Sequence, residues 1–449
     1  MENKTQKMGY FGTLSLVVGN IIGVGIFTTT GYITGYIQSP VFIMLAWLIG
    51  ALYALSGAKV YSVLVSEYPL TGGDYQYLGK SLHPLAGYLF GWSALFITYS
   101  GSIAALGIAA AYYLDGIVHI PGLETGFTVF SFDWFEMVIT VPKLLAIGFI
   151  LIFTWINYRG ILLSEKYQIA LTSAIFILLV IFSFAGSIST NVDYSRLFSF
   201  TDEDIAVSGF LVSLIAVLFS YIGWTTAVYV AEEIDQADKI IPRALKIGVL
   251  AVGIIYIWVN MVYLIALPVS EMGDVINIAT RVSEKLWGGQ GSFIISAIIL
   301  VAVFSSLNST ILSGPRIYYA MGREGYLGGL TRKIHPRFGS PSQAIMIQAF
   351  WSILLVLSGS FNQLLSFIVF VILAFSMLSA MISVKILFRR NKLSIGNLVS
   401  TGFYTLFCFV MMVNTMVEKP AESLIGIGLI LIAFPFYLLD KKLINNRNK

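Results

Sequence analysis

The sequence predicts an all-α integral membrane protein with twelve transmembrane helices, and three observations lead to this fold class. Of its 449 residues, 57% are hydrophobic and only 11% are charged, whereas soluble globular domains carry about 25% charged residues. The mean hydropathy is +0.85. The apolar residues fall into runs of about 20, which is the length with which a helix crosses roughly 30 Å of hydrocarbon.

The twelve helices follow the apolar runs in order along the chain. We expect them at residues 9–36, 41–66, 84–113, 134–156, 161–186, 206–233, 243–268, 291–320, 342–359, 361–388, 396–417 and 421–439. If the N-terminus is cytoplasmic, 21 of the 27 lysine and arginine residues fall in cytoplasmic segments, five fall outside, and Lys59 lies within a helix. The positive-inside rule therefore favours a multi-pass protein of the cell membrane with both termini in the cytoplasm.

The pattern of reactive residues argues against several other classes of protein. The sole cysteine, Cys408, rules out an intramolecular disulfide framework and a multi-thiolate metal site. The three histidines lie far apart, and the basic residues are spread along short loops. The sequence has no HExxH, GxSxG or phosphate-loop pattern. We therefore expect no enzymatic activity, no cofactor, no metal and no nucleic-acid partner.

The first predicted helix contains the sequence GNIIGVGIF at residues 19–27, where three glycines fall within seven residues. Each glycine weakens a helix by roughly 1 kcal/mol relative to alanine. A chain leaves helical geometry at membrane depth only where the freed backbone groups face protein or a water-filled cavity. Unwinding here would expose N–H groups at the start of a half-helix, which suit a carboxylate. The alternative is close helix packing through small residues.

A second interruption, FSYIGW at residues 219–224, lies near the middle of the sixth predicted helix. The first and sixth predicted helices run in opposite directions across the membrane, and each is the first of a set of five helices. Interrupted segments at matching positions of two oppositely oriented halves indicate a transporter site near the membrane midplane. We therefore expect one transporter domain, 1–449, with inverted repeats at 9–187 and 206–388 and two appended helices at 396–440.

Several short motifs resemble those of the amino acid–polyamine–organocation (APC) family, closest to its L-amino-acid-transporter branch. They are GVGIF at 23–27, PLTGGDYQYL at 69–78, NYRG at 157–160, EE at 232–233 before IPRA at 241–244, RIYYAMGREG at 316–325 and HPRFGSP at 335–341. Each motif is weak alone, but their order and spacing together are very specific. The resemblance implies a leucine-transporter-type fold, with a 5+5 inverted repeat plus two helices, and an amino acid substrate.

The resemblance also implies which residues bind the substrate. Its carboxylate is expected at backbone N–H groups of the first break, and its ammonium at carbonyls of the second. Val24 stands where the family usually has serine or threonine, so a hydroxyl donor is lost there. We expect the indole of Trp224 to pack against the substrate side chain. The predicted substrate-binding residues are Ile22, Gly23, Val24, Gly25, Phe219, Ser220, Ile222, Gly223 and Trp224.

Two charged residues are candidates for gating. Lys59 lies inside the second predicted helix, about 10 Å from its cytoplasmic end at 1.5 Å per residue. It either snorkels to the interface, forms an ion pair at an inner gate, or serves the substrate directly. Glu232 follows the sixth predicted helix. It is either solvated or paired with Arg323 or Arg159 across a cytoplasmic gate.

Three residues of the fifth and eighth predicted helices are candidates for ion coupling. Ile175 stands where some members of the resembled family carry a buried lysine in place of a cation, so that device is expected to be missing. Ser305 and Ser306 offer hydroxyls like those that bind sodium in cation-coupled relatives of the fold. The alternative is that these hydroxyls bond back to their own helix.

Together these features predict a secondary transporter of amino acids that works by alternating access. No acidic or basic side chain lies in the expected pocket, so neutral L-amino acids are favoured. An aromatic pocket also holds cations by cation–π contact, so basic amino acids or amines remain an alternative. A second hypothesis is a sensor that binds an amino acid without transporting it. Exchange, proton symport and sodium symport stay open, as does the oligomeric state.

Overall fold

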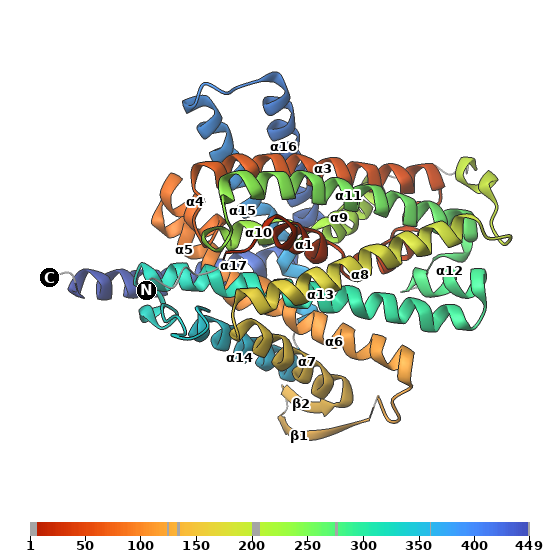
Figure 1. Ribbon diagram of the computed structural model, residues 1–449, viewed down its shortest axis with the longest axis horizontal. Coiled ribbons are helices and arrows are strands. Elements are labelled where there is room, and N and C mark those ends of the chain that lie inside the picture. The colour runs from red at the N-terminus through yellow and green to blue at the C-terminus, as the bar shows by residue number, and fades with distance from the viewer. Residues whose placement is uncertain are drawn as a thin grey trace.

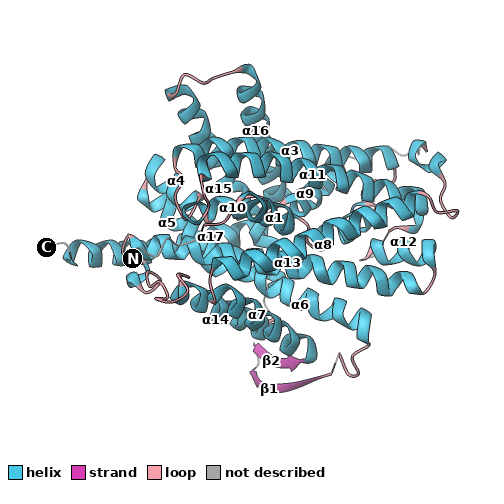
Figure 2. Cartoon of the chain, viewed as in Figure 1, coloured by secondary structure: helices cyan, strands magenta, loops and turns pink. Residues whose placement is uncertain are grey.

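A computed structural model describes residues 7–123, 125–132, 135–199, 207–273, 277–359 and 361–447, and these residues are mostly helical (Figures 1 and 2). The helices are α1 (Tyr10–Ile21), α2 (Gly25–Ile33), α3 (Pro40–Glu67), α4 (Asp74–Ser81), α5 (Pro84–Ser93), α6 (Tyr99–Val118), α7 (Val141–Tyr158), α8 (Ile161–Ser187), α9 (Val207–Tyr221), α10 (Thr226–Tyr229), α11 (Ala237–Ala266), α12 (Ile278–Trp287), α13 (Gln290–Arg323), α14 (Ser342–Ser358), α15 (Phe361–Arg389), α16 (Ile395–Glu418) and α17 (Pro420–Arg447). A π-helical segment, η1 (Ala94–Thr98), and the 3-10 segments η2 (Tyr194–Phe198), η3 (Ala231–Glu233), η4 (Val269–Glu271) and η5 (Leu327–Gly329) complete the helical elements.

The apolar helices confirm the predicted fold class. Within the described residues, ten helices are long and apolar enough to cross a membrane. The shorter apolar helices α9 and α14 account for the sixth and ninth predicted spans. The chain is therefore an all-α multi-pass membrane protein. The boundaries of the two repeats stay predictions.

The fourth predicted helix is wrong at its start, because a β-hairpin precedes it. Strand β1 (Gly126–Phe132) pairs antiparallel with β2 (Phe135–Thr140), and α7 begins only at Val141. The β2 sequence, FEMVIT, is rich in the aromatic and β-branched residues that favour strands. Pro142 then occupies the first turn of α7, where its missing N–H costs nothing. Residues 134 and 206, where two predicted helices begin, lie outside the described residues.

The helices enclose a central core around α1 (Figure 1). Helix α1 packs against α8, α11 and α13, and α2 packs against α9. Helix α16 packs against α15 and α3, and α17 packs against α5 and α15. The marked ends of the chain both lie toward the left of Figure 1, and we call this side the terminal end. Helix α12 lies at the opposite end.

Both predicted helix breaks are present in the structure. Helix α1 ends at Ile21 and α2 starts at Gly25, so three residues between them belong to neither helix. Helix α9 ends at Tyr221 and α10 starts at Thr226. The spans predicted at 9–36 and 206–233 are therefore each divided into two helices. The third predicted span is also irregular, since η1 lies between α5 and α6, and π-helical segments often mark functional sites.

Candidate functional site

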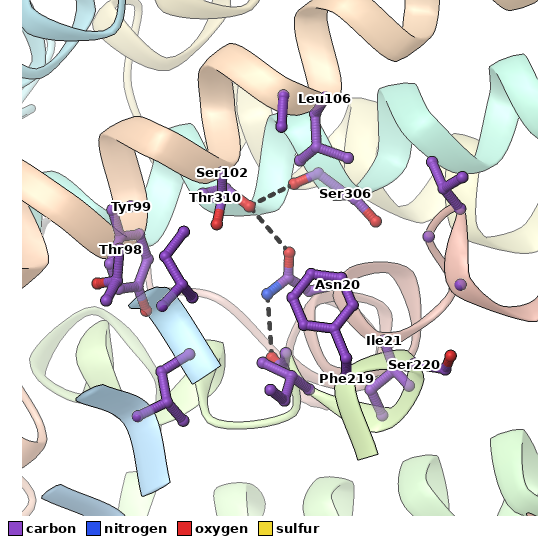
Figure 3. A pocket seen from close by; sticks show the side chains of 18 of the residues that line it. Asn20, Ile21, Thr98, Tyr99, Ser102, Leu106, Phe219, Ser220, Ser306 and Thr310 are labelled. Carbon is purple, nitrogen blue, oxygen red and sulfur yellow. Dashed lines mark hydrogen bonds between the residues drawn. The ribbon is translucent and has the colours of Figure 1, made fainter. Parts of the chain in front are cut away.

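A cavity of about 640 Å³ lies between the two helix breaks (Figure 3). Both breaks contribute to its wall, together with residues of α5, η1, α6, α7, α13 and α15, two tyrosines of α3 and single residues of α4, β2 and α16. The predominantly apolar wall carries scattered hydroxyl and amide groups, as small-molecule sites commonly do. The two interruptions that the sequence predicts therefore face one shared space.

The first break supplies hydrogen-bond donors. The N–H of Gly23 donates to the carbonyl of Ile21 at 2.9 Å, and regular bonding resumes where the N–H of Phe27 donates to Val24 at 3.0 Å. Within the described residues, the N–H groups of Val24, Gly25 and Ile26 between these points have no recorded hydrogen-bond acceptor. These groups lie at the start of α2, where the helix dipole favours a negative charge.

The second break supplies hydrogen-bond acceptors. Helix α9 ends at Tyr221, and Gly223 adopts a φ of 124°, which only glycine adopts without strain. The carbonyl of Phe219 accepts the N–H of Ile222 at 3.2 Å. Within the described residues, no hydrogen-bond donor is recorded for the carbonyls of Ser220, Tyr221 and Ile222. These carbonyls lie at a helix C-terminus, where the dipole favours a cation.

Asn20 joins the two breaks, and the sequence analysis did not identify it as a site residue. Its side-chain amide donates to the carbonyl of Gly223 at 3.1 Å and to the hydroxyl of Thr226. Its side-chain oxygen accepts a hydrogen bond from Thr310 of α13 at 3.1 Å (Figure 3). One residue therefore fixes the first break against the second and against α13. Its place inside the glycine-rich stretch, directly after Gly19, was the only signal in the sequence, and this does not reveal the contact with the second break.

The two breaks also touch through Gly25. A Cβ atom at this position would lie 2.5 Å from the Ser220 hydroxyl and 2.8 Å from the Ser220 Cα. Any side chain here would thus displace the second break. The Ser220 hydroxyl also lies 2.7 Å from that of Thr29 on α2, so α2 and the end of α9 form one unit.

Trp224 borders the cavity at the side of α3 and α16. It is only 4% exposed, and its ring meets Tyr61 edge-on at 5.0 Å and Tyr404 at 6.4 Å between centroids. Tyr53 stacks on Tyr404 at 4.8 Å. All four rings line the cavity. They form an aromatic pocket, which we define as Tyr53, Tyr61, Trp224 and Tyr404.

The structure places the predicted site residues in two groups. Nine of them line the cavity, and these are Gly23, Val24, Gly25, Phe219, Ser220, Ile222, Gly223, Trp224 and Ser306. Five do not, and these are Ile22, Lys59, Ile175, Glu232 and Ser305. Ile22 is fully buried, and its carbonyl accepts a hydrogen bond from the Ser306 hydroxyl at 3.2 Å.

The junction of α1, α8 and α13 is filled with hydroxyl and amide groups. The Ser306 hydroxyl donates a hydrogen bond to the carbonyl of Gly19 on α1 at 3.1 Å. Both predicted serines therefore contact side chains or carbonyls of other helices, as the following distances show for Ser305. Ser305 lies 3.1 Å from Thr172 and accepts from Gln168 at 3.0 Å. Ile175 is fully buried on α8, one of the elements of this junction.

Lys59 contacts α16 and not the cavity. Its ammonium donates to the carbonyl of Gly396 and, at 3.2 Å, to the hydroxyl of Ser400. Both acceptors lie in the first two turns of α16. The lysine therefore joins α3 to α16, which none of the three sequence-based alternatives anticipated.

The expectation that no charged side chain lies in the pocket is wrong. Asp74 and Lys143 both line the cavity, although neither belongs to a helix break. Asp74 opens α4, in the connection after α3, and Lys143 lies in the first turn of α7. The Lys143 ammonium donates to the carbonyls of Val138 at 2.7 Å and Leu357 at 2.9 Å. Neither was predicted, because Asp74 comes from the connection after α3 and Lys143 from the end of a helix, far in sequence from both breaks.

Ion pairs tie together the segments around η3. Arg316 of α13 is fully buried and donates to both carboxylate oxygens of Glu233, at 2.8 and 2.9 Å. Glu232 pairs with Arg323 at 2.7 Å. The N-terminal segment joins them, since the N–H of Met8 donates to the carbonyl of Glu233 at 2.8 Å. Arg159, the other predicted partner of Glu232, instead lies over the rings of Trp155 and Phe338.

A multi-pass helical fold with two broken helices facing one cavity defines a membrane transporter, and comparisons with known proteins agree. The amino acid permease family model matches residues 8–438. The chain is 27% identical to amino acid transporter protein 6 of Caenorhabditis elegans, over 98% of this chain and 84% of that protein. It is 28% identical to the serine/threonine exchanger SteT of Bacillus subtilis, over 86% of this chain and 84% of that protein.

A third relative comes from the resembled branch. The chain is 24% identical to the large neutral amino acids transporter small subunit 2 of Homo sapiens, over 97% of this chain and 80% of that protein. The chain belongs to the amino acid permease family, within the APC group, as its sequence motifs indicate.

Proposed function

We propose that the protein is a secondary transporter of neutral L-amino acids, working by alternating access with the substrate held between the two breaks. The observation that carries this proposal is that the N–H groups of Val24 and Gly25 and the carbonyls of Ser220 and Ile222 lie around one cavity. None of these four groups has a recorded hydrogen-bond partner within the described residues. A zwitterion needs donors at one end and acceptors at the other. Backbone groups supply both without the cost of burying fixed charges in the membrane.

The charged residues of the cavity favour a neutral substrate. Lys143 already donates to two carbonyls, and Asp74 is only 2% exposed and accepts hydroxyl hydrogen bonds. Neither therefore presents a free charge to a substrate side chain. The aromatic pocket offers large apolar surfaces instead. The printed names of two relatives, a serine/threonine exchanger and a large neutral amino acids transporter subunit, support the same substrate class.

The proposed orientation places the terminal end in the cytoplasm. The excess of lysine and arginine on that side of the predicted spans supports this orientation. The ion pairs Arg316–Glu233 and Arg323–Glu232 then belong to a cytoplasmic gate, which is closed here. The protein acts as a carrier and not as an enzyme.

Uptake into proteoliposomes tests this function directly. Purified protein is reconstituted with unlabelled L-leucine or L-threonine inside, and radiolabelled L-leucine, L-threonine, L-arginine or L-glutamate is added outside. We expect exchange of the two neutral amino acids above protein-free liposomes and little uptake of the charged ones. Preferred uptake of arginine would overturn the neutral class. Saturable binding of leucine with no exchange and no net uptake would instead indicate a sensor.

A further inference from the structure

Asp74 carries a buried carboxyl group that has no role in the proposed binding of the amino acid. It lies at the start of α4 and lines the cavity. Its Oδ1 accepts hydrogen bonds from Tyr61 of α3, at 2.8 Å, and from Ser379 of α15. Its Oδ2 accepts from Tyr229 of α10 at 2.8 Å. We call these four residues the Asp74 cluster.

No cation balances this carboxyl in the described part of the chain, where none of the recorded ion pairs includes Asp74. The titratable side chains that act on it are tyrosines, which stay neutral at physiological pH. They come from α3, α4, α6, α10 and α16, and they are Tyr61, Tyr77, Tyr99, Tyr229 and Tyr404. An ionised carboxylate without a counter-charge is costly when buried.

The charged residues of the elements around α4 are engaged elsewhere. On α13, Arg316 and Arg323 pair with Glu233 and Glu232 of η3. Glu324, which directly follows α13, accepts hydrogen bonds from Tyr75 and Gln76. On α3, Glu67 pairs with Arg389 of α15 and with Arg390, which directly follows this helix. Lys59 of α3 donates to the carbonyl of Gly396 on α16. Lys385 of α15 donates to the Ser81 carbonyl, and His83 accepts from the N–H of Leu85. Asp440 of α17 accepts from Tyr88 of α5.

The cluster can hold a proton. Burial raises the pKa of the Asp74 carboxyl above its usual value, and the hydrogen bonds from Ser379, Tyr229 and Tyr61 offset this only in part. A protonated carboxyl donates one hydrogen bond, and the Ser379 hydroxyl is placed to accept it. Serine can then donate back to a carbonyl of its own helix. The two tyrosines still donate to the carboxyl oxygens.

The cluster also lies across a contact that an opening of the terminal end would break. Besides the Tyr229–Asp74 bond, the N–H of Gly72 donates to the carbonyl of Tyr229 at 3.0 Å. The N–H of Thr71 donates to Glu232 of η3 at 3.2 Å. The connection before α4 and the first residue of α4 are thus held to α10 and η3 by three hydrogen bonds. Separating them would admit water to Asp74.

We propose that Asp74 is a proton-binding site that couples amino acid transport to proton movement, an inference that rests on the proposed transport function. The closed terminal end favours the protonated carboxyl because the charged form is buried. Opening favours the ionised form because water stabilises the charge, so the proton leaves to the terminal side. The proton enters through the cavity, which reaches Thr140 and Lys143 at the start of α7. One proton binds and one is released, and no other bond changes.

Proton flux and amino acid flux measured together test the proposal. Proteoliposomes hold a pH-sensitive dye, and radiolabelled L-leucine or L-threonine is added from an acidic outer buffer. The wild type is expected to acidify the interior by about one proton per amino acid, and Asp74→Asn to fall below about one tenth of that ratio. An unchanged ratio in Asp74→Asn would overturn the proposal. Exchange by the wild type without proton movement would overturn it and leave the transport function intact.

Two further variants decide the question if Asp74→Asn does not fold. Tyr61→Phe and Tyr229→Phe each remove a donor that stabilises the ionised carboxyl. The pH at which proton-coupled uptake is half-maximal should therefore rise by roughly half to one pH unit. The control is Tyr263→Phe, which changes a fully buried tyrosine of α11 whose hydroxyl has no hydrogen-bond partner among the described residues. If the pH of half-maximal proton-coupled uptake in Tyr61→Phe and Tyr229→Phe equals that of the control variant, Asp74 is not the proton-binding site.

Discussion

The indole of Trp224 lies where the sequence predicts a contact with the substrate, beside the second break. Its position in the middle of a span argued against an interfacial tryptophan, and the structure buries it against Tyr61 and Tyr404 in the wall of the cavity. No hydrogen-bond acceptor is recorded for its N–H within the described residues. The side chain is thus held by ring contacts and limits the depth of the aromatic pocket.

Replacing Trp224 by alanine should change substrate selectivity. The variant enlarges the aromatic pocket, so bulky amino acids should gain relative to small ones, and loss of one aromatic contact should weaken binding of small substrates by roughly 1–3 kcal/mol. Competition by alanine, leucine and phenylalanine against radiolabelled uptake measures this. Trp155→Ala is the control, because Trp155 is 55% exposed on α7 and outside the cavity wall. An unchanged rank order would mean that Trp224 does not meet the substrate.

Residues of the site differ in how readily the sequence reveals them. The glycines of the breaks are visible because their spacing conflicts with a helix. Asn20 is not, because its role depends on the distance between two breaks 200 residues apart, which only the fold sets. Asp74 lies in the connection after α3 and Lys143 in the first turn of α7, and nothing in a single sequence places either position against a cavity.

At the scale of the element, the breaks and most helix boundaries follow from composition and glycine placement. Helix α3, predicted at 41–66, spans Pro40–Glu67, and α8, predicted at 161–186, spans Ile161–Ser187. The β-hairpin before α7 was missed because a short apolar run of aromatic and β-branched residues fits a strand and a helix end equally well. Strand pairing across the hairpin decided between them.

The contact between the two breaks can be tested at Gly25. A leucine there would drive its Cβ into Ser220 and push α9 from α2, so Gly25→Leu should abolish amino acid binding while the protein still inserts in the membrane. Binding of radiolabelled leucine to the purified variant measures the effect. The control is Gly402→Leu on α16, where an added Cβ meets nothing within 4 Å. Wild-type affinity in a folded Gly25→Leu protein would contradict the placement of the site.

At the scale of the whole molecule, the cavity runs between two differently built ends. At the terminal side, Asp74 and the ion pairs of Glu232 and Glu233 hold α4, α10, η3 and α13 together. At the other side, the cavity reaches the first turn of α7. The family and fold class were accessible from the sequence, since they depend on hydropathy and motif order. The ion pairs and hydrogen bonds at the terminal end were not, since they connect segments that lie far apart in the sequence.

The central claim is that backbone groups of the two breaks bind both ends of a zwitterion. The most direct measurement is competition against radiolabelled L-leucine binding by leucine, leucine methyl ester and N-acetyl-leucine, which share one side chain. Removing either charge should weaken competition by at least about tenfold, because a hydrogen bond to a charged group contributes about 1.5–3 kcal/mol. An ester or an acetyl derivative that competes as well as leucine itself would contradict the account.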